Sequence, residues 1–281
     1  MNQSNIKNAI EASLIADSYL LGSHWIYDVG ELQNLAIDWN KLNAPCAQWH
    51  KGKEKGDFTH YGDHTKWLLD FVEEYKTFDI ETYKNIWLKN MQTYKGYIDG
   101  ACKDTIQIIS NDASAVFGSS SHDLSIVGRI APLLYVSETK EEFLSNVKGF
   151  VSFTHNNSIV LNVASLFGNV LYDVTNGVSI EDALATAQVS KEIQEAFNAG
   201  IASKGKETFT CIQEFGSACS VEGGFEGTLH LLVSYDDFKE VMIANAKAGG
   251  DSSARGMIVA MIMGAAGCKI PITWREDTKG V

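Results

Sequence analysis

The residues from Gly249 to Trp274 read GGDSSARGMIVAMIMGAAGCKIPITW, and this stretch decides the fold. A glycine turn leads into Asp251, a residue type that favours the position just before a helix. Residues 257–267 are almost all small or apolar, which predicts a helix buried on most of its circumference. A membrane span needs about 20 such residues, so this shorter run favours a core helix. The helix start could be ordinary capping, or it could face a cleft and bind an anion or a metal-bridged anion.

The composition is that of a globular protein with a sizeable core. Hydrophobic residues make up 45% of the 281 positions and charged residues 21%. Only three prolines are present, which favours a helix-rich chain over a sandwich with many turns. The formal net charge of −12 argues against a nucleic-acid partner and against an anionic membrane surface.

The five cysteines are odd in number and lack Cys-x-x-Cys spacing. This pattern indicates free thiols in a reducing compartment more than a disulfide framework or a zinc site. The N-terminal residues show no basic and apolar leader, so we expect a cytoplasmic location.

Apolar residues recur at three- and four-residue spacing along most of the chain. The first helix should begin after a cap at Ser4 or Asn5 and end near Gly22. Asp17 falls on or beside the apolar stripe of this helix. Burying a carboxylate there costs free energy unless the carboxylate is paired or bound to a ligand. A surface position would also explain Asp17. Further helices are expected over 67–75, 83–94, 105–109, 143–153, 160–171, 229–232 and 238–248, whereas 38–62 and 205–224 look irregular. We therefore predict an all-α fold, a compact orthogonal multi-helix bundle forming one domain over residues 1–281.

Three loops carry candidate site residues. The first contains His24, Trp25, Tyr27 and Asp28, which could wall a ligand pocket or anchor the loop to the core. The second leads through a charged, glycine-containing segment to Asp63, which follows a glycine at the start of a helix, as Asp251 does. The third is rich in small residues, which permit close backbone approach to a ligand but also suit a simple linker; it contains Ser119, Ser120 and Ser121.

The order of these features resembles the ADP-ribosylglycohydrolase family. The resemblance rests on Tyr-Gly-Asp-His-Thr at 61–65, Gly-Arg-Ile-Ala-Pro-Leu at 128–133, Thr-His at 154–155 and Gly-Gly-Asp-Ser-Ser-Ala-Arg at 249–255. It runs from about residue 9 to residue 274. It implies a compact all-α domain that binds Mg²⁺ or Mn²⁺ and hydrolyses N- or O-glycosidic bonds of small-molecule or protein-linked ADP-ribose.

The resemblance also implies roles for individual residues. Asp63 and Asp251 would be catalytic and, with Ser253, would bind metal, because hard cations prefer oxygen ligands. The expected substrate contacts are His24, Trp25, Tyr27, Asp28, Ser119, Ser120, Ser121, His155 and Arg255.

The metal motifs depart from the family pattern. Typical members read Thr-Asp-Asp-Thr and Gly-Gly-Asp-Thr-Asp-Thr, whereas this chain has Gly62-Asp63-His64-Thr65 and Gly250-Asp251-Ser252-Ser253-Ala254. Two carboxylates are therefore missing, and we expect one metal ion or none. The variant motifs are most similar to the branch that contains the jellyfish J-type crystallins. An enzyme, a catalytically silent ADP-ribose-binding or nucleotide-binding protein, and a crystallin-like structural protein all remain open.

Overall fold

The helix α13 (Ser252–Ala265) lies in the interior of the protein, and every one of its residues is buried. The structure is a computed structural model that describes residues 2–281. Asp251 is the N-cap residue of α13, and its side chain accepts a hydrogen bond from the backbone N–H of Ala254 at 3.1 Å. The sequence prediction of a core helix that starts at Asp251 is thereby confirmed.

The first helix, α1 (Gln3–Leu20), packs along α13. Two glycines of α13 permit this close contact. A Cβ atom on Gly256 would overlap Leu20 of α1, and one on Gly264 would lie 2.5 Å from the Cβ of Ala12. The two ends of the chain thus form the central helix pair, with small residues at the interface so that the backbones can approach.

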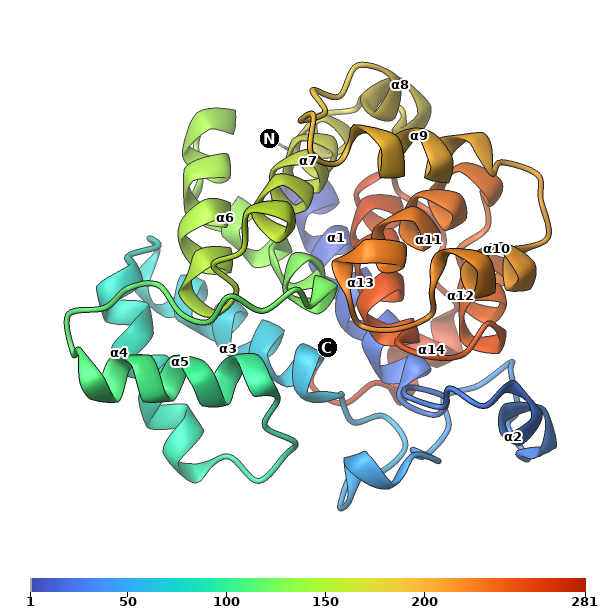
Figure 1. The fold of residues 1–281 in the computed structure, drawn as a ribbon, viewed down its shortest axis with the longest axis horizontal. Coiled ribbons are helices and arrows are strands. Elements are labelled where there is room, and N and C mark those ends of the chain that lie inside the picture. Colours follow the sequence, from blue (N-terminus) through green and yellow to red (C-terminus); the bar gives the residue numbers. More distant parts are fainter. Residues whose placement is uncertain (1) are drawn as a thin grey trace.

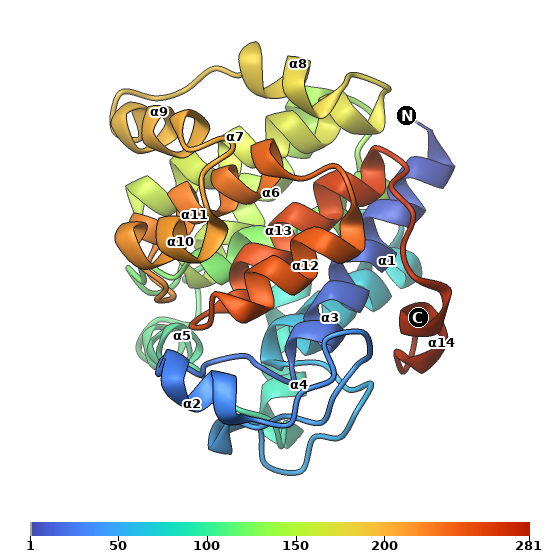
Figure 2. The same ribbon diagram turned by 90° about the vertical axis from the view of Figure 1, so that its right-hand side faces the viewer.

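The remaining helices surround this pair (Figures 1 and 2). On one side of it, in the view of Figure 1, lie α3 (His60–Tyr75), α4 (Ile80–Thr93), α5 (Gly100–Asn111) and α6 (Lys140–Thr154). On the other side lie α8 (Ile180–Ala185), α9 (Gln194–Ala202), α10 (Thr208–Phe215), α11 (Val221–Ser234) and α12 (Phe238–Lys247). The other elements are α2 (Val29–Asn34), α7 (Ser158–Thr175), α14 (Ile272–Asp277) and the 3₁₀ helices η1 (Gln48–His50), η2 (Leu124–Arg129) and η3 (Ala131–Val136). Between residues 2 and 281 no strand is formed, so the all-α prediction is confirmed.

Several predicted boundaries were wrong. The cap of α1 is Asn2, whose side chain accepts from the N–H of Ser4. The stretch 205–224 contains α10, and 38–62 contains η1 as well as the start of α3. The helix α10 has eight residues and η1 has three, and an apolar repeat over so few residues does not stand out in the sequence.

The helix α7 is apolar enough over 18 residues to match a membrane span, with a mean hydropathy of 1.3. Of that window, 56% is buried inside the protein. Its packing partners include α6 and α13. The apolar residues of α7 are thus explained by core packing.

Candidate functional site

Two glycines place the start of α13 against the loop that follows α1. Gly249 and Gly250 have φ angles of 73° and 66°, a region that favours glycine. The backbone of Gly250 exchanges hydrogen bonds with this loop: its N–H donates to Ile26 and its carbonyl accepts from Trp25, at 2.8 and 2.9 Å. The turn therefore fixes Asp251 beside the aromatic residues of the first predicted loop.

The carboxylate of Asp251 is completely buried and held by aromatic side chains. Its Oδ2 accepts hydrogen bonds from the Tyr61 hydroxyl at 2.8 Å and from the Trp25 indole at 3.4 Å. His24 Nδ1 lies 3.5 Å from Oδ1, but burial, followed by nearby cationic groups, lowers the pKa of His24 well below its usual value. His24 is therefore neutral near pH 7, and its contact with Asp251 is not an ion pair.

Arg255 binds the surrounding loops rather than an open cavity. Its guanidinium donates to the side chain of Asn245 at 3.0 Å and to the carbonyls of Ser217 and Gly249 at 3.1 and 2.7 Å. Burial lowers the pKa of Arg255 to about 10, so it stays cationic at neutral pH and its charge offsets that of Asp251. Its predicted contact with substrate stays a prediction.

The second predicted carboxylate, Asp63, lies in the first turn of α3 and has different partners. Both Lys53 Nζ, at 2.6 Å, and the Tyr94 hydroxyl, at 2.5 Å, contact its Oδ2. The Asp63 side chain is 16% exposed, whereas that of Asp251 is not exposed. The two carboxylates are thus fixed by separate sets of groups, and only Asp63 reaches solvent.

Asp17 is buried beneath this helix start. Its carboxyl accepts from the N–H of Thr59 at 2.8 Å and from the Thr59 hydroxyl at 2.7 Å. Burial raises the pKa of Asp17 to about 6; the Thr59 bonds oppose this, and the charge of Asp63 adds to it. Ser253 Oγ is buried and has no hydrogen-bond partner among residues 2–281.

A third carboxylate, Asp123, was not predicted as a site residue. Asp123, Cys219 and Asp251 each offer a ligand atom within 4.8 Å of the others. Burial, and next the charge of Asp251, raises the pKa of Asp123 to about 7. Burial, followed by these two acids, raises the pKa of the Cys219 thiol to about 12. Asp123 caps η2, an ordinary helix-capping pattern, so nothing in the local sequence separated it from a structural residue.

The predicted serine loop shapes the approach to Asp123. Ser119 Oγ donates to the carbonyl of Thr154 at 2.8 Å and accepts from the N–H of Ser121. Ser121 Oγ in turn accepts from the N–H of Asp123. Ser120 is exposed. Two of the three serines therefore have hydrogen bonds within the loop.

The other predicted substrate contacts lie at different depths. His155 is completely buried, and its Nδ1 lies 2.8 Å from the Thr154 hydroxyl. Trp25 is partly buried and has a positive φ of 63°. Tyr27 is 48% exposed. Asp28 is the N-cap of the peripheral helix α2, where its Oδ1 accepts from the N–H of Glu31.

Within the described part of the chain, several buried side-chain nitrogen and oxygen atoms have no hydrogen-bond partner. They include the Nε2 atoms of His24, His50, His64 and His155 and the Oγ atom of Ser252. Buried polar atoms in folded proteins nearly always have a partner. These atoms are thus available to water or to a ligand.

The donor groups can be compared with the two-ion centre that the resemblance implies. Asp63 is bonded to the ammonium of Lys53. Among residues 2–281, the only triad of His, Cys, Asp or Glu donors within 4.8 Å contains Asp251 but not Asp63. The residues therefore do not fit a dinuclear magnesium or manganese centre built on Asp63 and Asp251. That one ion or none binds stays a prediction.

The site belongs to an all-helical protein in which acidic side chains lie at helix starts, beside the loop that follows α1. The sequence model of the family described as ADP-ribosylglycohydrolase matches residues 2–280, and the chain belongs to this family. The predicted family is confirmed.

Two jellyfish proteins and one solved structure are similar over nearly the whole chain. Crystallin J1A and Crystallin J1B of Tripedalia cystophora are each 22% identical, over 299 and 300 residues; each match covers 97% of this chain and 91% of the relative. A solved ADP-ribosylglycohydrolase-related protein complex superimposes with a TM-score of 0.72 at 15% identity, covering 98% of this chain and 94% of the other. At this identity the structural match supports the fold alone.

Proposed function

We propose that this protein hydrolyses the glycosidic bond of an ADP-ribosyl compound, with Asp63 as the residue that directs water to the anomeric carbon. Membership of the ADP-ribosylglycohydrolase family supports the reaction class. The observation that carries the assignment is the position of Lys53. Its ammonium holds Asp63, and the same side chain lines a cavity of about 480 Å³. Cavities of several hundred Å³ are typical of small-molecule sites.

The geometry of Asp63 suits a base. Lys53 and Tyr94 both contact Oδ2, which fixes the carboxylate and leaves Oδ1 for a water molecule. In the proposed reaction the water oxygen bonds to the anomeric carbon and one proton of that water passes to Asp63. The bond from the anomeric carbon to the released group breaks with its electron pair on the released group, which then takes up the proton that Asp63 received. The negative charge of Asp63 also stabilises the oxocarbenium-like transition state of such a reaction.

We further propose that Lys53 replaces a metal ion beside Asp63. A metal at this carboxylate would place two positive charges next to the ammonium, which lies 2.6 Å from Oδ2. Asp251 then serves to position Tyr61 and Trp25 instead of contacting substrate, because it is buried and bonded to both side chains.

Release of ADP-ribose tests the proposal. Purified protein is incubated with ADP-ribosyl-arginine, an ADP-ribosylserine peptide and a small-molecule ADP-ribosyl acetate, and the free ADP-ribose is separated by chromatography. Loss of a general base typically costs about 10²–10⁴-fold in rate, so Asp63→Asn should reduce turnover at least a hundredfold. The matched control is Asp104→Asn, which removes an exposed carboxylate from α5 and should keep the wild-type rate. Wild-type turnover in Asp63→Asn would refute the role of Asp63.

A second candidate is a catalytically silent protein that keeps the cleft for ADP-ribose or a nucleotide, or serves as a crystallin-like structural protein. It is favoured by the two missing carboxylates and by the 22% identity to Crystallin J1A over 97% of the chain. Binding of ADP-ribose without release from any of the three substrates would select this function over hydrolysis.

A further inference from the structure

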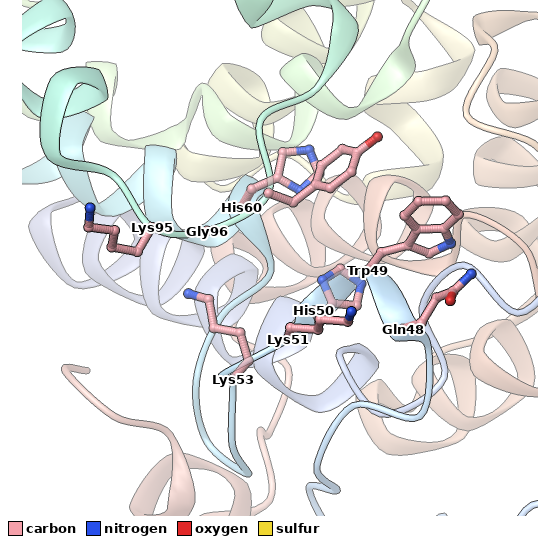
Figure 3. Close-up of a pocket in the computed structure, with 9 residues that line it drawn as sticks. Gln48, Trp49, His50, Lys51, Lys53, His60, Lys95 and Gly96 are labelled. Atoms are coloured by element: carbon pink, nitrogen blue, oxygen red, sulfur yellow. The ribbon is translucent and has the colours of Figure 1, made fainter.

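Apart from Lys53, the residues that line the cavity beside Asp63 have no part in the proposed hydrolytic step. We call this cavity the lysine pocket and define it by Trp49, His50, Lys51, Lys53, Lys95 and Tyr97. The first four of these come from η1 and the loop after it, and the other two from the connection between α4 and α5. Figure 3 shows Lys53 and Lys95 toward one side of the pocket and Trp49 toward the other, with His50 and His60 between them.

The charge of the lysine pocket is opposite to that of the whole protein. Three lysines line one cavity in a chain of net charge −12. Lys53 is paired with Asp63, but in the part of the chain that the structure describes neither Lys51 nor Lys95 has a carboxylate within ion-pair distance. Both residues line the cavity and both side chains are exposed, so two positive charges lie at the cavity without a counterion among the described residues. A local cluster of this kind attracts anions despite the overall negative charge.

The pocket also presents an aromatic surface. Trp49 is 50% exposed, the largest exposed fraction of any tryptophan among the described residues. Its ring meets Tyr97 edge to face, at 6.1 Å between centroids and 76° between planes. The edge contact holds the indole in place and leaves its face open to a planar ligand. Stacking on such a face is strong and tolerates different bases.

A buried histidine completes the lining. His50 is 5% exposed and stacks on Trp25 at 5.4 Å, which fixes its orientation. Its Nε2 has no partner within residues 2–281. An unpartnered ring nitrogen, nine-tenths buried and lining a cavity, is a polar group available to a ligand.

We propose that the lysine pocket binds the phosphate of a phosphorylated nucleoside, with Lys51, Lys53 and Lys95 around the anion and the base stacked on Trp49. The inference deepens the proposed function, because Lys53 would link the bound phosphate to Asp63. It rests on the proposed function only for that link, since the lysines, the indole face and His50 would bind a nucleotide whether or not hydrolysis follows.

Calorimetric titration of ADP, AMP, adenosine and inorganic phosphate into the full-length protein tests the inference. We expect affinity to fall in the order ADP, AMP, adenosine, and to fall with added salt because the contacts are between exposed charges. Removal of one charge-assisted contact should weaken ADP binding about tenfold, so Lys95→Ala and Lys51→Ala should each show this loss. Lys148→Ala removes the same charge from an exposed position on α6 and serves as the control.

The variant Trp49→Ala tests the contribution of base stacking separately from that of phosphate binding. It should weaken ADP at least tenfold while leaving the weaker binding of inorganic phosphate unchanged, because stacking involves only the ring. Trp49, Lys51 and Lys95 have side chains at the surface, and thermal melts of each variant check that the fold is intact.

The outcomes distinguish this inference from the proposed function. Equal ADP affinity in the wild type, in the Lys51→Ala Lys95→Ala double variant and in Trp49→Ala would overturn the lysine pocket, even if ADP-ribose is released by an Asp63-dependent reaction. Failure of the wild type to bind ADP at millimolar concentration would also overturn it. Lysine- and Trp49-dependent ADP binding without any hydrolysis would support the pocket and refute the enzymatic proposal.

Discussion

Replacement of Asp17 by asparagine should stabilise the protein near neutral pH. Asp17 is completely buried, and burial raises its pKa from a usual 3.8 to about 6. One pKa unit corresponds to about 1.4 kcal/mol, so ionising this carboxyl in the folded state costs about 3 kcal/mol relative to the unfolded state. Asparagine has nearly the same shape and keeps an acceptor for Thr59, but it has no charge to bury.

The sign of the pH dependence follows from the raised pKa. Between about pH 4 and pH 6 the folded protein holds a proton on Asp17 that the unfolded chain has released. The contribution of Asp17 to stability is therefore full below pH 4, falls as the pH rises toward 6 and levels off above it. The stability advantage of Asp17→Asn should grow by about 3 kcal/mol across this window and then stay constant.

Urea unfolding followed by circular dichroism at half-unit steps from pH 4 to pH 8 measures this difference. The variant Asp104→Asn removes an exposed carboxylate from α5 and controls for the change in net charge. A difference between wild type and Asp17→Asn that does not change between pH 4 and pH 7 would refute the raised pKa of Asp17.

Three further substitutions test the construction of the site. Gly62→Ala should lower the melting temperature by several degrees, since the new Cβ would overlap the Asp17 carboxylate oxygen; an unchanged melt would show that α3 shifts freely. Asn157→Ala removes the side chain that accepts from two N–H groups at the start of α7 and should cost about 1 kcal/mol in urea unfolding, whereas no loss would mean that water caps the helix equally well. Arg255→Lys cannot reproduce three separate guanidinium contacts and should destabilise the protein by more than about 1.5 kcal/mol; wild-type stability in this variant would argue against its structural role.

The parts of the fold predicted from the sequence are those with local signals. The glycine turn, Asp251 and the apolar run define α13 within 17 residues, and all of these features recur in the structure. Capping and periodicity depend on neighbours in sequence, so one sequence contains enough information to predict them.

The parts that were missed depend on contacts between distant segments. Lys53 stood in a stretch interpreted as a flexible charged connection, yet it bonds to Asp63. Asp123 and Cys219 approach Asp251 only because the chain brings three separate loops together. No local pattern identifies such partners. The one available signal for the lysine pocket was the pair Lys51 and Lys53 beside Trp49 in a charged loop.

Titration of ADP-ribose into metal-stripped protein, repeated with added Mg²⁺ and with the variant Lys53→Ala, tests the central claim most directly. If Lys53 replaces the cation beside Asp63, wild-type protein binds ADP-ribose equally well with and without Mg²⁺, and Lys53→Ala binds at least tenfold more weakly without the metal. Binding that requires Mg²⁺ in the wild type and survives in Lys53→Ala would contradict the account.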